Sequence, residues 1–280
     1  MCTLIAGVRV LGAGTLVIGA NRDESPARPS ASPGVLRARP RVVGGRDLEA
    51  GGTWLAIREA RFVTALLNRR PLADAVASGG AAGSGAPPLR SRGLLCLDAA
   101  AGPPADDAPH ALDPATGERY PARRDAALRL LDRDPYGHCT LVGLGADGEA
   151  WSIHAGHGGA PEARALDPGW HVVTHVDPDD RSEPRTAWIL DALRGYAPSG
   201  AEEALARLAG ILRSHGEAGD GASGAGGAGD GGPPVCLHGP RFPTVSSTLV
   251  ALGAPGGPRY HHAPGPPCVT PYEDVSVLLA

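Results

Sequence analysis

The sequence predicts an α+β protein whose strands pair as antiparallel hairpins. Three observations support this class: β-prone runs occur in pairs, turn signals separate the two members of a pair, and only a few segments have helical periodicity. The chain has 280 residues, of which 42% are hydrophobic, enough to bury the core of one large domain or two small ones. We expect a single domain over residues 1–280.

Three antiparallel pairs of strands are expected, followed by two strands near the end of the chain. In one pair the turn contains Asp147-Gly148, a strong hairpin signal. The Pro-, Ser- and Arg-rich residues 25–40 are expected to form a loop. The pairs are residues 3–10 with 15–20, 51–57 with 62–68, and 141–144 with 150–153, and the last strands are 247–252 and 275–279.

Three helices are expected from their starting residues and their periodicity. The first two cover residues 123–132 and 183–193, and the second has Pro184 in its first turn. The third follows Ser199-Gly200-Ala201-Glu202, which is typical of a capping box. Its apolar residues repeat at helical spacing, at Leu205, Leu208, Ile211 and Leu212.

The composition excludes several classes of function. The net charge is −4 and all 26 basic residues are arginines without a sustained run, so no nucleic-acid partner is expected. No stretch is as long as a membrane span, and no signal peptide is expected because Arg9 interrupts the apolar N-terminus. Five cysteines, an odd number, favour a reducing compartment, and we expect a cytoplasmic protein. The sequence does not indicate its oligomeric state. The Gly/Ala-rich residues 77–88 and 216–234 are expected to be flexible insertions within the domain.

Cys2 is a candidate nucleophile because of its position. Methionine aminopeptidases remove Met1 when a small residue follows, so the thiol and a free α-amine would share one residue. A terminal amine has a pKa of about 7.7 to 8.0 and cysteine one of about 8.5, so this amine can act as the base for its own thiol. The β-prone run from Thr3 would hold the residue in place. The alternative is that Cys2 is only a small residue at a processed N-terminus.

Several blocks of sequence resemble the NRDE family, also called the transport and Golgi organization family. The tetrapeptide Asn21-Arg22-Asp23-Glu24 is the one from which the family takes its name, and the other blocks occur in the family's order over about the first hundred residues. The second half is similar more loosely, at residues 172–175 and 239–248. The other early blocks are Met1-Cys2-Thr3, Arg28-Pro29, Gly51-Gly52-Thr53-Trp54-Leu55-Ala56, Thr64-Ala65-Leu66-Leu67-Asn68 and Ser91-Arg92-Gly93.

The resemblance implies a fold and a site. The family is similar to choloylglycine hydrolase and penicillin V acylase, which cleave amide bonds and have a four-layer αββα fold of the N-terminal-nucleophile (Ntn) hydrolase type, with two antiparallel sheets between helical layers. By this similarity Cys2 matches the nucleophile, Asp23 matches the aspartate that bonds the nucleophilic residue, and Asn68 matches an oxyanion-hole asparagine. Trp54 is interpreted as core or as pocket wall.

The resemblance also has departures. Those acylases carry a second asparagine and a late arginine at the site, and the corresponding positions here hold His175 and Val245. Arg241 lies four residues before Val245 and could take the arginine's place. Asn21 and Arg22 are further candidates for the site lining, although Arg22 with Asp23 could also be an ion pair at a strand end.

No metal site and no cofactor are expected. Cys236-x-His238, His154-x-x-His157 and His261-His262 contain ligand types but lack the spacing of zinc sites. The four later cysteines are interpreted as buried small hydrophobic residues: Cys96, Cys139, Cys236 and Cys268.

The resulting hypothesis is hydrolysis of a carbon–nitrogen acyl bond in a small-molecule acyl amide, through a thioester on Cys2. The alternative is a catalytically silent binding or trafficking protein for a lipid-like, acyl-CoA or haem ligand. The departures at His175 and Val245 favour the alternative, and the joint presence of Cys2, Asp23 and Asn68 favours the enzyme.

Overall fold

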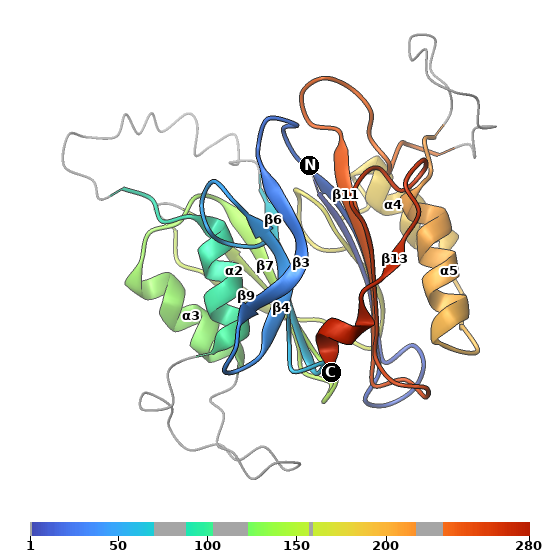
Figure 1. The fold of residues 1–280 in the computed structure, drawn as a ribbon, viewed down its shortest axis with the longest axis horizontal. Coiled ribbons are helices and arrows are strands. Elements are labelled where there is room, and N and C mark those ends of the chain that lie inside the picture. Colours follow the sequence, from blue (N-terminus) through green and yellow to red (C-terminus); the bar gives the residue numbers. More distant parts are fainter. Residues whose placement is uncertain (1, 70–87, 103–122, 157–158, 217–231) are drawn as a thin grey trace.

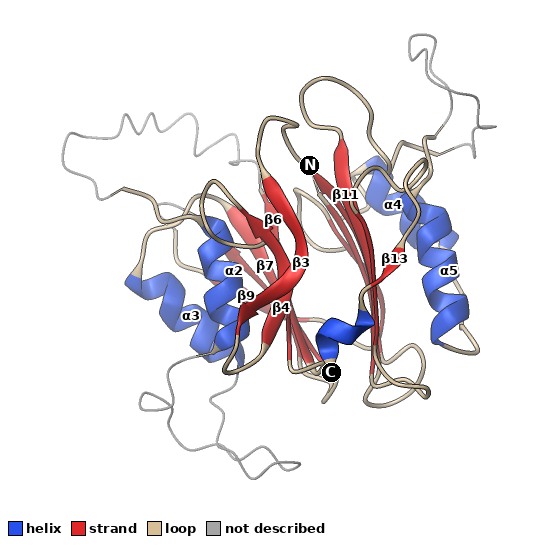
Figure 2. Ribbon diagram, in the orientation of Figure 1, coloured by secondary structure: helices blue, strands red, loops and turns tan. Residues whose placement is uncertain are grey.

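The computed structural model describes residues 2–69, 88–102, 123–156, 159–216 and 232–280. In this part of the chain, two antiparallel sheets face each other and helices cover the outer side of each sheet (Figure 1). Figure 2 shows the resulting order of layers, helix, sheet, sheet, helix. The expected α+β sandwich of two antiparallel sheets is therefore confirmed. The expected insertions lie outside the described residues, except for 88, 216 and 232–234 at their ends.

The first sheet has the order β10-β1-β2-β11-β12-β13. The expected hairpin at its centre is confirmed, because β1 pairs with β2 in a register that places Thr3 opposite Asn21. The long strand β11 pairs with the other side of β2 and places Thr244 opposite Asp23. The strands are β1 (Thr3–Val8), β2 (Leu16–Asp23), β10 (Gly169–Val173), β11 (Thr244–Leu252), β12 (Arg259–Ala263) and β13 (Glu273–Asp274).

The second sheet has the order β3-β4-β5-β6-β7-β8-β9. It contains the other two expected antiparallel pairs, β5 with β6 and β7 with β8. The turn between β7 and β8 includes Gly148 at φ +94°, a backbone conformation that glycine adopts without strain. The strands are β3 (Ser30–Arg37), β4 (Val42–Asp47), β5 (Leu55–Arg58), β6 (Phe62–Asn68), β7 (Cys139–Gly145), β8 (Ala150–Ala155) and β9 (Glu162–Ala165).

Helices α2 (Arg92–Ala101) and α3 (Arg123–Arg133) cover the second sheet, and α4 (Pro184–Ala192) and α5 (Ala201–Leu212) cover the first (Figure 1). The three expected helices are confirmed, and α2 was not predicted. The capping box is wrong in detail, because Gly200 is the N-cap and Glu203, not Glu202, accepts hydrogen bonds from the backbone and side chain of Ser199. No helix in the described part of the chain is long and apolar enough to cross a membrane.

Two further sequence predictions are wrong. Residues 30–37 form β3 rather than a loop, because β3 is an edge strand, where the missing N–H of Pro33 is tolerated. Residues 276–279 form a short 3₁₀ helix, η2 (Ser276–Leu279), rather than a strand. There the hydroxyl of Ser276 accepts the backbone N–H of Tyr260 at 2.9 Å, which replaces a bond of the sheet ladder.

Alternation along β1 separates two cores. Leu4, Ala6 and Val8 belong to the core between the two sheets, whereas Ile5 belongs to the core between the first sheet and α4 and α5. Cys2 packs against the core between the sheets. Side chains alternate in the same way along β2, so Arg22 faces the opposite side of the sheet from Asn21 and Asp23.

Candidate functional site

A cleft with a volume of about 540 Å³ contains Cys2 in its lining. Cys2 directly precedes β1 of the first sheet, and Asn68 is the last residue of β6 in the second sheet. Both line this cleft, together with Arg22 and Trp54. The cleft therefore brings together four of the residues that the sequence marks as site candidates, and they come from both sheets.

Asp23 lies behind this cleft rather than in its lining. Its buried carboxylate accepts a hydrogen bond from Thr244 Oγ1 at 2.7 Å and lies 3.6 Å from the guanidinium of Arg185 in α4. Arg185 also donates to Thr3 Oγ1 at 2.9 Å, so Thr3 and Asp23 both face the helices. Burial raises the pKa of Asp23 to about 6, while the bond from Thr244 and the charge of Arg185 act to lower the pKa.

The Cys2 thiol is partly exposed and lies close to the β2 backbone. Its Sγ is 3.9 Å from the carbonyl oxygen of Asp23, a weak contact. Burial, more than the negative charge of Asp23, raises the pKa of this thiol, and the positive charge of Arg22 acts to lower it. The thiol is therefore protonated at neutral pH and requires a base before it can attack a carbonyl.

Arg22 faces the cleft and is held by an aromatic ring. Its guanidinium lies 4.3 Å from the centre of the Trp54 ring and donates to Ser30 Oγ at 3.2 Å. Within the described ranges no carboxylate lies within ion-pair distance of Arg22. The interpretation of Arg22 and Asp23 as an ion pair is therefore wrong, and the cation that pairs with Asp23 is Arg185.

Two of the sequence blocks meet at the edge of the cleft. Thr53 N donates to the carbonyl oxygen of Gly93 at 3.0 Å, and a Cβ atom at Gly52 would lie 2.2 Å from the carbonyl carbon of Gly93. Only glycine fits at position 52, because any side chain would prevent the close approach of the backbone at Gly52 to the backbone at Gly93. The contact places Arg92 in the cleft lining, where it donates to the carbonyl oxygen of His138 at 3.0 Å.

Three other site candidates do not line this cleft. Asn21 is buried on the helix side of β2, where Nδ2 donates to the carbonyl oxygens of Leu212 at 2.8 Å and Val235 at 3.1 Å. His175 lies beyond the end of β10, and Arg241 is exposed in the segment before β11. Arg241 is therefore not placed where it could act as the late arginine of the acylases.

Sequence reasoning missed Arg185 and Thr244, which are partners of Asp23 among the described residues. Thr244 lies inside a block that resembles the family, so its motif was a usable signal. Arg185 had no comparable signal, because an arginine in the first turn of a helix is usually solvated and only the packing of α4 shows that it is buried.

The order of layers, with two antiparallel sheets between helices, makes the fold Ntn-hydrolase-like. The family model described as Transport and Golgi organisation 2 matches residues 1–111, which confirms the resemblance carried by the N-terminal blocks. No curated protein sequence matches the chain.

Three solved structures share the fold. The Caenorhabditis elegans N-acylethanolamine-hydrolyzing acid amidase ortholog has a TM-score of 0.54 at 13% identity, over 91% of this chain and 95% of that chain. A variant of conjugated bile acid hydrolase from Clostridium perfringens has a TM-score of 0.51 at 10% identity, over 100% and 94% of the chains. Penicillin V acylase from Agrobacterium tumefaciens has a TM-score of 0.50 at 12% identity, over 98% and 86%. At such identities the likeness shows the fold alone.

Proposed function

We propose that this protein is an Ntn hydrolase that cleaves the amide bond of a small acyl amide, with Cys2 as nucleophile after Met1 is removed. The observation that carries the proposal is that Cys2 and Asn68, from different sheets, line one cleft while Asp23 is buried directly behind Cys2. The printed names of the three similar structures are those of an amidase, a hydrolase and an acylase, which supports the same reaction class.

The reaction begins at the two functional groups of Cys2. Its free amine takes the thiol proton, and the thiolate attacks the carbonyl carbon of the amide. The side-chain N–H of Asn68 donates to the oxyanion that forms. As the carbon–nitrogen bond breaks, the leaving amine takes the proton from the Cys2 ammonium group, and the acyl group remains as a thioester.

Water then completes the cycle. The Cys2 amine takes a proton from a water molecule, whose oxygen attacks the thioester carbonyl. The carboxylic acid leaves and the thiolate regains its proton from the ammonium group. In both steps the carboxylate of Asp23 stabilises and orients the amine when it is positively charged, and Arg185 and Thr244 hold this carboxylate in place.

The charges in the cleft suit a substrate that carries an anionic group. Arg28 is paired with Asp47 at 2.7 Å, whereas in the described part of the chain neither Arg22 nor Arg92 forms an ion pair with a carboxylate. Both guanidinium groups line the cleft that contains Cys2. A carboxylate, sulfonate or phosphate on the substrate would form ion pairs with these two guanidinium groups. N-acyl amino acids are therefore the first substrates to test.

The experiment compares the wild type with Cys2→Ser and Cys2→Ala on a panel of N-acyl amino acids, acyl lactones and acyl amides. We expect intact mass without Met1, turnover by the wild type, and no turnover by Cys2→Ala at unchanged melting temperature. Cys139→Ala is the matched control, because Cys139 is buried in β7 and should leave activity in place. Retained Met1, or turnover that survives Cys2→Ala, would falsify the mechanism.

A second candidate function is binding without turnover. The observation that favours it is that neither His175 nor Arg241 lines the cleft. The second asparagine and the late arginine of the acylases therefore have no substitute from these two residues in the cleft lining. Under this alternative, acyl-CoA or haem binds equally well to the wild type and to Cys2→Ala, and no member of the panel is hydrolysed.

A further inference from the structure

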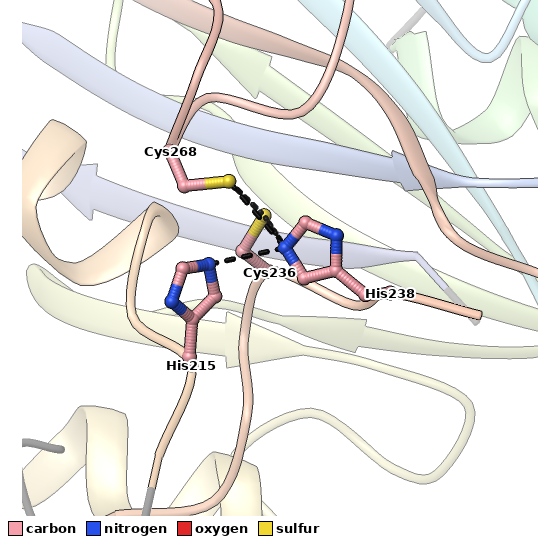
Figure 3. Close-up of side chains that lie close together, drawn as sticks. All are labelled: His215, Cys236, His238 and Cys268. Atoms are coloured by element: carbon pink, nitrogen blue, oxygen red, sulfur yellow. Dashed lines mark hydrogen bonds between the residues drawn. The ribbon is translucent and has the colours of Figure 1, made fainter. Parts of the chain in front are cut away.

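Four side chains with metal-binding atoms converge on the first-sheet side of the fold, away from the Cys2 cleft. His215 follows α5, Cys236 and His238 lie ahead of β11, and Cys268 lies between β12 and β13. Figure 3 shows both imidazole rings and both sulfurs pointing toward a common centre. Their ligating atoms all lie within 4.8 Å of one another. No metal was expected from the sequence because Cys236-x-His238 is a short isolated pair without the spacing of a zinc site, and the other two ligands lie in separate segments.

Four of the six distances between the ligating atoms are close to those of a tetrahedron around one ion, and the two from His215 to the sulfurs are at most 4.8 Å. With Zn–S of about 2.3 Å and Zn–N of about 2.0–2.1 Å, a tetrahedral site places two sulfurs about 3.8 Å apart, sulfur and nitrogen about 3.5 Å, and two nitrogens about 3.3 Å. The sulfurs of Cys236 and Cys268 are 3.6 Å apart. His238 Nε2 is 3.9 Å from Cys236 Sγ, 3.4 Å from Cys268 Sγ and 3.1 Å from His215 Nε2.

The donor set indicates which ion fits. Two thiolates with two imidazoles in a tetrahedron are typical of Zn²⁺, and hard cations such as Mg²⁺ and Ca²⁺ prefer oxygen ligands. Cys96 and Cys139 provide a contrast inside the same protein. They are buried neighbours in the core between the second sheet and its helices, and among the described residues they belong to no group of metal-ligating side chains.

The backbone holds the ligands in position independently of any ion. The carbonyl oxygen of Ser214 accepts N–H groups from Val235 at 3.0 Å and from Cys236 at 2.8 Å, which fixes Cys236 beside His215. Gly216 at φ +72° and Gly239 at φ +138° follow the two histidines directly and let the chain turn away from the cluster.

We propose that His215, Cys236, His238 and Cys268 bind one Zn²⁺ as a closed structural site. All four positions of the tetrahedron come from the protein, so the ion has no open position for a substrate. It joins the end of α5, the segment before β11 and the loop between β12 and β13.

The site is connected to Asp23 through Leu237, which lies between two of the ligands. Leu237 N donates to Thr244 Oγ1 at 2.9 Å, Thr244 N donates to the Leu237 carbonyl oxygen at 2.9 Å, and Thr244 Oγ1 donates to Asp23 at 2.7 Å. The ion thereby fixes the segment that orients the Thr244 hydroxyl. The zinc proposal does not depend on the proposed reaction at Cys2.

The first test is metal content and spectroscopy of the full chain. Mass spectrometry of dialysed protein should find about one zinc ion per chain, as for a closed four-ligand site. Replacement of zinc by Co²⁺ should produce visible d–d bands of a tetrahedral ion and a thiolate-to-cobalt charge-transfer band. Chelation should lower the melting temperature by roughly 5 °C or more, because a structural ion is bound only by the folded state.

The second test uses variants. Cys236→Ser, Cys268→Ser and His215→Ala should lose zinc and the cobalt bands, whereas the controls Cys139→Ser and His261→Ala should keep both. His215→Cys should keep the ion and strengthen the charge-transfer band, which preserves a readout if a loss variant fails to fold. The proposal is overturned if wild type holds no more zinc than His215→Ala, or if protein purified under reducing conditions contains a Cys236–Cys268 disulfide in place of metal.

Discussion

Thr244 Oγ1 donates a 2.7 Å hydrogen bond to Asp23 Oδ1 across a sequence separation of 221 residues. The bond joins β11 to β2 at the point where the two strands leave regular pairing. It stabilises the ionised carboxylate against the burial that raises its pKa. Thr244 therefore acts on the candidate site through Asp23, and each part of this relationship can be tested separately.

Replacing Thr244 by valine should shift the pH dependence of the reaction without abolishing activity. Thr244→Val removes the hydroxyl that lowers the pKa of Asp23, so this pKa should rise above about 6. The acid limb of the kcat/KM profile should then move to higher pH, while Thr244→Ser, which keeps the hydroxyl, should retain the wild-type profile. The prediction fails if both variants give the same profile.

The raised pKa of Asp23 predicts a slope of stability against pH. The ordinary pKa of an aspartate is 3.8 and the pKa of Asp23 in the folded state is about 6, so the folded state binds the proton more tightly. Stability is therefore highest below pH 3.8, falls as pH rises through 6, and is level above it, for this group alone. The change is at most about 3 kcal/mol. Urea unfolding from pH 4 to 7 should show this slope in wild type and a flatter one in Asp23→Asn; equal slopes would contradict it.

Arg185 is expected to stabilise the fold by pairing with the buried Asp23. Arg185→Met removes the guanidinium that lies 3.6 Å from that carboxylate, and breaking this buried pair should cost about 3 kcal/mol of unfolding free energy. Arg194→Met is the matched control, because the Arg194 side chain is 74% exposed and its loss should cost less than about 0.5 kcal/mol. Chemical denaturation measures both. A cost for Arg185→Met as small as that of the control would show that the pair is not structural.

The two asparagines of the chain should behave differently. Asn68→Ala should lower kcat by roughly a hundredfold to a thousandfold with little change in melting temperature, because it removes an oxyanion donor at the cleft. Asn21→Ala should instead lower stability, by about 2 kcal/mol, because it leaves the buried carbonyls of Leu212 and Val235 without a donor. Kinetics and thermal unfolding of both variants separate the roles. Equal losses of kcat would contradict this division.

Thiol labelling should distinguish the five cysteines. Cys2 and Cys268 are the partly exposed ones among the described residues, and Cys96, Cys139 and Cys236 should react slowest because they are buried. With zinc bound, brief iodoacetamide treatment should modify Cys2 first, and Cys268 should become reactive only after chelation. Peptide mapping before and after chelation gives the order. Rapid labelling of Cys268 in untreated protein would contradict the protection expected from zinc.

Local patterns predicted the elements whose signals lie within a few residues. The hairpin of β1 and β2, the Asp147-Gly148 turn and the helix at 201–212 all depend on short-range periodicity and turn geometry. The predictions for residues 30–37 and 276–279 were wrong because contacts with other elements, not the local pattern, decide their structure. For β3 the neighbour is β4 at the edge of a sheet, and for η2 it is Tyr260.

The sequence by itself marked Cys2, Arg22, Trp54 and Asn68, because an early cysteine and family motifs are readable in the order of residues. The β-prone run from Thr3 also predicted that neighbouring residues alternate between two faces, and the structure shows that Cys2 faces the core between the sheets and Thr3 the other side.

Only the tertiary structure decided which groups surround Asp23 and which residues form the zinc cluster. Arg185 and Thr244 meet Asp23, and His215 meets Cys268, because packing of helices on a sheet brings together segments far apart in the chain. Ion pairs and metal sites require contact within a few ångströms. Such distances follow from how the layers pack, not from spacing along the sequence.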